Sequence, residues 1–136
     1  EEIQGAVLDA KLKHLDKWNN SRRKTAQVYF DELKEINQLS LPVEKEKRKH
    51  VYHLFVPKAQ SRDKLREFLE KKGISTAIHY PVPIHLQPAF LEFGFKKGQF
   101  PVSEETALKI VSLPMYYGMT QDEVQYVSES IKEFYA

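Results

Sequence analysis

The most informative stretch of the sequence is residues 76–88, which read TAIHYPVPIHLQP. The stretch passes from residues typical of a strand into a loop with three prolines, which fix φ and remove backbone donors. The loop carries His79, Tyr80, His85 and Gln87, whose side chains can hydrogen-bond a polar ligand. Rigidly held loops often contain binding residues. A structural crossover, whose polar groups cap neighbouring backbone, is an equally good interpretation of the residue chemistry.

The composition limits the class of protein. A chain of 136 residues with 41% hydrophobic and 12% aromatic residues is long and apolar enough to form one folded domain. The net charge of +2 argues against a dedicated nucleic-acid binder. No apolar run reaches membrane-spanning length, and no secretory signal pattern opens the chain. Cysteine is absent, which excludes disulfides and thiolate ligands. We expect a soluble cytoplasmic protein.

The first residues predict a helix that is apolar on two sides. Its stripes are Ile3, Ala6, Val7 and Ala10 on one side, and Leu8, Leu12 and Leu15 on the other. Such a helix needs cover on both sides, so we expect one layer from this domain and the other from a partner or from upstream sequence. The chain also begins with Glu rather than Met. We therefore expect it to be a fragment.

Further helices follow from periodicity and capping signals. A second helix is predicted over residues 16–37, with Arg22, Arg23 and Lys24 on its solvated side. A third is predicted from an N-cap at Ser61, and later helices from Ser103 and from the capping-box sequence of residues 120–123. A short helical turn is expected over residues 89–93, closed by Gly94.

Three short strands are predicted, over residues 50–56, 75–80 and 112–115. Their order among the helices predicts an α+β fold, in which helices pack on a short three-stranded sheet.

The sequence contains no complete set of catalytic residues. A Gly-rich phosphate loop, zinc-type ligand spacing and a nucleophile elbow are all absent. His50 and His53 would lie on opposite faces of a strand, and no carboxylate is close in sequence to His79 and His85. The sequence therefore predicts no metal site.

Five ordered segments resemble the C-terminal domain of the DegT/StrS-type sugar-nucleotide aminotransferases, which use pyridoxal 5′-phosphate (PLP). They are residues 2–8 (EIQGAVL), 12–19 (LKHLDKWN) with the arginines at 22–23, 79–90 (HYPVPIHLQPAF), 100–104 (FPVSE) and 112–116 (SLPMY). Gly5 departs from the Ala that is usual at its position. The likeness spans essentially the whole chain.

The resemblance implies the small C-terminal domain of a homodimeric PLP fold type I enzyme. Such enzymes transfer an amino group, usually from glutamate, to a nucleotide-linked keto-sugar for polysaccharides, glycans or antibiotic sugars. Residues 1–136 would then be the C-terminal domain, with connecting helices over 1–37 and an α+β substrate-side subdomain over 50–136. The large PLP-binding domain, with its Schiff-base lysine, would lie outside this chain. We expect the fragment alone to be inactive, and no residue in it is assigned as catalytic.

The same resemblance implies roles for individual side chains. His79 and Tyr80 match a His-Tyr pair implied to line the pocket for the hexose and pyrophosphate. His85 and Gln87 match the next polar positions, either as substrate contacts or as residues that shape the loop. Gln4 would begin the helix beside the segment that binds the PLP phosphate.

Two alternatives are open. A few relatives are dehydratases with His in place of the Schiff-base lysine, and that residue would lie outside this chain. The chain could also be a free-standing, non-catalytic interaction module that docks a partner through its two-faced first helix.

Overall fold

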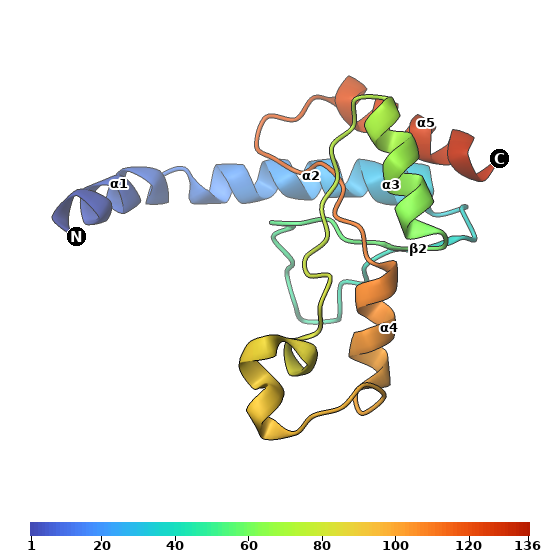
Figure 1. Cartoon of the computed structure of the whole chain (residues 1–136). Helices are drawn as coiled ribbons and strands as arrows, with labels where there is room; N and C mark the ends of the chain where they lie inside the picture. Colours follow the sequence, from blue (N-terminus) through green and yellow to red (C-terminus); the bar gives the residue numbers. More distant parts are fainter.

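Helices dominate the fold. The computed structural model describes residues 1–136, and Figure 1 shows the arrangement of the elements. In chain order they are α1 (Glu2–Leu12), α2 (Leu15–Leu33), β1 (Leu39–Ser40), β2 (Lys58–Ala59), α3 (Arg62–Lys71), the 3-10 helices η1 (Ile84–Leu86) and η2 (Pro88–Phe93), α4 (Pro101–Lys109) and α5 (Gln121–Tyr135).

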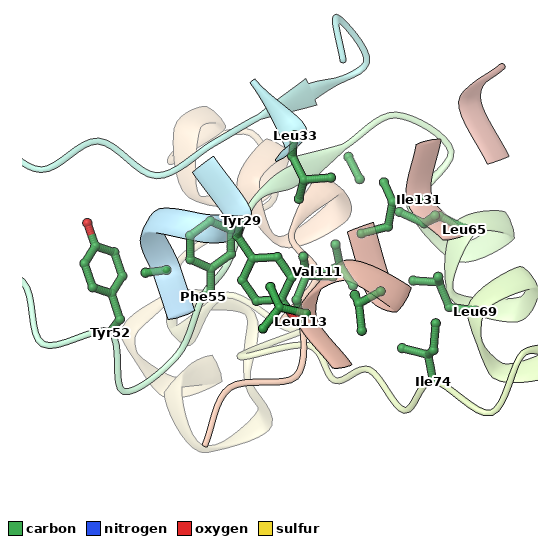
Figure 2. Packing of buried hydrophobic residues seen from close by; sticks show 14 residues of the cluster. Tyr29, Leu33, Tyr52, Phe55, Leu65, Leu69, Ile74, Val111, Leu113 and Ile131 are labelled. Atoms are coloured by element: carbon green, nitrogen blue, oxygen red, sulfur yellow. The ribbon is translucent and has the colours of Figure 1, made fainter. Parts of the chain in front are cut away.

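The core lies where α2, α3 and α5 meet. A cluster of 14 buried hydrophobic residues fills this space, and Figure 2 shows how their side chains pack. Each helix contributes the residues that its periodicity predicts, such as Leu33 from α2, Leu65 from α3 and Ile131 from α5. Burial of each such side chain stabilises the fold by about 1.5–3 kcal/mol. Eight of the 14 residues come from these three helices and six from the extended segments and β2, so the core combines amphipathic helices with the segments that lie against them.

Two aromatic rings join the helical layer to the extended segments. Tyr29 of α2 packs against Phe55 with ring centroids 4.9 Å apart. The Tyr29 hydroxyl donates to the carbonyl of Pro114 at 2.9 Å, which satisfies a buried polar group. Burial raises the pKa of Tyr29 well above its usual value.

The sheet is smaller than predicted. It contains only β1 and β2, which pair antiparallel with Leu39 opposite Ala59. The predicted strands over 50–56, 75–80 and 112–115 meet only at isolated bridges, Phe55 with Leu113 and Ala77 with Ser112. The prediction of a three-stranded sheet was therefore wrong, although it placed the right segments next to one another.

Backbone chemistry explains why these segments do not form longer strands. Tyr52 has φ +47, and its N–H bonds to Nδ1 of His50, so a turn interrupts the first predicted strand. Pro57, Pro81 and Pro114 follow the bridged residues, and proline has no N–H to donate to a ladder.

Arg22 and Arg23 are not simply solvated, which corrects the prediction made for them. Arg22 donates to the carbonyl of Val51 at 3.3 Å, and Arg23 pairs with Glu44 at 3.1 Å and with the carbonyl of His50. Both arginines are half-buried, whereas Lys24 is exposed as expected. The two arginines therefore hold residues 44–51 against α2.

The helix starts agree with the capping signals in part. At α5 the side chain of Thr120 accepts from the N–H of Glu123, and Glu123 accepts from the N–H of Thr120, as the capping box predicts. Gly94 ends η2 in the left-handed region, also as predicted. Ser61 precedes α3 but makes no side-chain cap bond, and α4 begins at Pro101, before Ser103.

Helix α1 extends away from the body of the molecule (Figure 1). None of its residues is buried, and Ile3 is 81% exposed. The expectation that this domain covers one of the two apolar stripes was therefore wrong. No helix in the chain combines the length and the hydrophobicity needed to cross a bilayer.

Candidate functional site

A groove of about 570 Å³ lies between the proline loop and α4. Hydrophobic residues make up nine of its 14 lining residues, including Phe90, Phe95 and Phe100. The polar side chains along it are His79, Tyr80, His85, Ser103 and Thr106. Three of the four predicted site residues therefore lie together on this groove. An apolar surface with a few convergent polar groups is typical of a small-molecule site.

His79 is anchored to the core. Its Nδ1 lies 2.8 Å from the hydroxyl of Ser112, and Ser112 is itself buried. The backbone of Ser112 bonds to that of Ala77 in both directions, which holds the start of the loop. Tyr80 follows His79 through a cis peptide bond, and its side chain is 71% exposed. His79 is thus fixed in place, while Tyr80 presents its ring and hydroxyl at the open side of the groove.

His85 is the most deeply placed of the predicted residues, with only 9% of its surface exposed. Its Nε2 lies 3.0 Å from Oε1 of Glu104, and its ring packs on Phe100 with centroids 4.7 Å apart. Glu104 stands 19 positions further along the chain, so local spacing did not suggest the pair. Its presence in the FPVSE segment was the one sequence signal that could have drawn attention to it.

The carboxylate of Glu104 accepts hydrogen bonds from several groups besides His85. It accepts from the N–H of Gly98 at 2.8 and 2.9 Å and from the N–H of Phe100 at 3.3 Å. The Gly98 N–H above all, with further help from His85 and Phe100, holds the pKa of Glu104 below its usual value. Glu104 therefore remains a carboxylate and joins α4, the turn before it and the proline loop.

Two other residues singled out from the sequence lie outside the groove. Gln87 does not line it, and its side-chain amide donates to the carbonyl of Val82 at 3.5 Å within the same loop. This contact favours a role in shaping the loop over direct contact with a ligand. Gln4 is exposed on α1 and does not line the groove either. No group of three or more metal-ligating side chains is arranged to hold a metal ion.

The sequence matches a family model over nearly its whole length. The model describes the DegT/DnrJ/EryC1/StrS aminotransferase family and matches residues 1–132. The chain belongs to this family. The groove lined by His79, Tyr80 and His85 therefore lies within the part of the chain that matches the family.

Curated relatives and solved structures of this family resemble the chain throughout. It is 42% identical to the pleiotropic regulatory protein of Geobacillus stearothermophilus, over 99% of this chain and 37% of that protein. It is 36% identical to the dTDP-3-amino-3,4,6-trideoxy-alpha-D-glucose transaminase of Streptomyces venezuelae, over 98% of this chain and 35% of that protein. The crystal structure of S. venezuelae DesV in complex with a ketimine intermediate has a TM-score of 0.94 at 36% identity, covering 98% of this chain and 36% of that chain. The chain therefore spans just over a third of the length of these relatives.

The groove does not by itself fit PLP. A Schiff base with the PLP aldehyde requires a lysine amine, and the phosphate favours cationic donors. The groove is lined by no lysine and no arginine. Its imidazoles, phenol and hydroxyls instead suit a neutral, hydroxyl-rich ligand with apolar faces.

Proposed function

We propose that the chain is the C-terminal part of a PLP-dependent aminotransferase that transfers an amino group, from glutamate, to a keto-sugar linked to a nucleotide. The observation that carries this proposal is the match over 98% of the chain to a relative named as a dTDP-amino-sugar transaminase. Membership of the DegT/DnrJ/EryC1/StrS aminotransferase family over residues 1–132 agrees with it. These similarities favour amino transfer over the dehydratase and interaction-module alternatives.

The cofactor and its lysine belong, in this proposal, to polypeptide outside the third of the relatives that this chain matches. PLP supplies the electron sink that amino transfer needs. The absence of a lysine among the groove residues supports this division of labour. Residues 1–37 would connect the two parts, and residues 50–136 would form the substrate side. The chain alone should then be inactive.

The groove would form one wall of the substrate site. His79, Tyr80 and His85 would contact the sugar nucleotide, and the phenylalanines would exclude water from it. His79 is suited to this role because Ser112 fixes its ring, so little side-chain entropy is lost on binding. Gln87 would keep the loop in shape. A homodimeric, cytoplasmic enzyme completes the proposal and follows from the family resemblance.

The proposal is tested on the full-length protein. We expect the purified protein to bind PLP, to lose the yellow colour of the cofactor when glutamate is added, and to regain it with a nucleotide-linked keto-sugar. Mass spectrometry should detect the aminated sugar nucleotide. A protein that binds no PLP, or that releases water from the sugar without gaining nitrogen, would contradict the proposal.

A further inference from the structure

Glu104 stands behind the groove rather than in it. It is not a lining residue, yet it bonds to two residues that are, His85 and Phe100. The same carboxylate accepts two contacts from the N–H of Gly98. One side chain therefore determines how two neighbouring wall residues face the groove.

The bond between Glu104 and His85 also determines the chemistry of the imidazole. A carboxylate can only accept a hydrogen bond, so Nε2 of His85 must carry the hydrogen and donate it. Nδ1 has no hydrogen-bond partner within the chain and is not sealed off from solvent. In an imidazole with hydrogen on Nε2 alone, Nδ1 is an acceptor. A ligand in the groove would then meet a lone pair at His85.

We propose that Glu104 is a positioning residue that holds His85 in the Nε2–H tautomer, so that His85 accepts a hydrogen bond from a hydroxyl of the sugar. A phosphate oxygen has no hydrogen to donate to Nδ1, so His85 recognises the sugar and not the pyrophosphate. This assignment rests on the proposed function, because the ligand is the nucleotide-linked sugar. Phe100, held by the same carboxylate, provides the apolar wall beside it.

The first test needs no substitution and no substrate. The full-length protein is labelled with ¹⁵N-histidine, and the imidazole of His85 is identified by its loss in His85→Gln. We expect the chemical shifts of a ring with hydrogen on Nε2 and a bare Nδ1 at neutral pH. A ring with hydrogen on Nδ1 alone, or on both nitrogens, would overturn the assignment.

The second test compares two ligands on three full-length variants. Calorimetry measures the Kd of a nucleotide-linked hexose and of the matching nucleoside diphosphate, which lacks the sugar. In Glu104→Gln the amide oxygen can still accept from the backbone, but the amide N–H₂ turns toward His85 and favours hydrogen on Nδ1. Glu104→Ala removes the contact altogether. Glu105→Gln is the matched control, because Glu105 is exposed on the same helix and pairs only with Lys109.

We expect the Glu104 variants to weaken binding of the nucleotide-linked hexose about three- to tenfold, the value of one hydrogen bond, with little change for the nucleoside diphosphate. Glu105→Gln should leave both affinities unchanged. An equal loss of affinity for both ligands would mean that Glu104 has only a structural role, and it would overturn the proposal. Unchanged affinities for both ligands would overturn it too. A wild-type protein that binds neither ligand would contradict the proposed function, and with it the proposed hydrogen bond from the sugar to His85. The tautomer of His85 would still be tested by the first experiment.

Discussion

The body of the molecule and its groove corner are stabilised in different ways. The body, where α2, α3 and α5 pack, has a cluster of apolar side chains that are each at most 5% exposed (Figure 2). The groove corner, residues 79–107, leaves many of them exposed, and Phe93 is 61% exposed. It lies below α3 and α5 in Figure 1, and Arg62 at the start of α3 contacts its end at Ala107. The polar contacts that hold the corner include His79 with Ser112, His85 with Glu104, and Arg62 with the carbonyls of Ala107 and Ile110.

The difference shows how this fold separates stability from binding. Burial of apolar surface contributes most of the free energy of folding, and the body uses it fully. Directed hydrogen bonds contribute about 1 kcal/mol each but fix orientation. The corner uses these bonds and keeps its apolar surface available to a ligand or to further polypeptide.

Removing one phenylalanine from each region gives the largest contrast. Phe55→Ala should lower the free energy of unfolding by about 3–5 kcal/mol, because Phe55 is fully buried against Tyr29 and Phe30. Phe93→Ala should change it by less than about 0.5 kcal/mol. Urea unfolding of both variants measures the difference, and similar losses would show that the two regions do not differ in this way.

Arg62 joins the two regions, so its removal should have an intermediate effect. This buried side chain of α3 donates to the carbonyl of Ala107 at 3.3 Å and to that of Ile110 at 3.1 Å. Arg62→Met leaves both carbonyls without this donor and should cost about 1–3 kcal/mol. Amide hydrogen exchange should increase in α4 more than in α5. The exposed Lys64→Met is the control, and a uniform increase in exchange would contradict a local role.

The contact between His79 and Ser112 tests one polar bond of the corner. Ser112→Ala removes the hydroxyl that bonds Nδ1 of His79 and should cost about 1 kcal/mol. Ser103→Ala, at an exposed groove residue, should cost less than about 0.5 kcal/mol. Thermal unfolding of the two variants provides the measurement. Equal midpoints would mean that the serine hydroxyl does not hold the loop.

The smallest effect is a dependence on acidic pH. The pKa of Glu104 is lower in the folded chain than its ordinary value of 4.5, chiefly because the Gly98 N–H bonds to the carboxylate, so the folded state binds fewer protons than the unfolded state. Its contribution to stability is therefore complete above about pH 4.5 and is lost as pH falls through the folded pKa. Glu104→Gln should lose less stability than the wild type between pH 5 and pH 3. Chemical unfolding at several pH values measures this. An equal fall in the free energy of unfolding of the wild type and of Glu104→Gln would contradict the prediction.

The sequence predicted local features well. The capping box at Thr120, the left-handed Gly94 and the apolar faces of α3 and α5 each depend on residues a few positions apart. Three of the four polar residues singled out in the proline loop line the groove, and their role in binding stays a prediction. Such features need no knowledge of distant partners.

Two of the features that were missed depend on contacts between residues far apart in the sequence, and a third depends on a local turn. Glu104 meets His85 across 19 positions, and Arg23 meets Glu44 across 21. The strand over residues 50–56 was predicted from β-branched and aromatic residues, but the contact of His50 with the Tyr52 N–H turns the backbone there. Propensity could not anticipate a positive φ at a tyrosine.

Helix α1 has a consequence for any measurement of folding on this chain. An isolated helix of 11 residues is marginal in water, and α1 has no buried residue to stabilise it. It can therefore fray at temperatures where the body is intact, so helix content by circular dichroism should begin to fall before the cooperative transition. A sloping folded baseline would then report on these residues, while the tyrosine signal from the core remains flat.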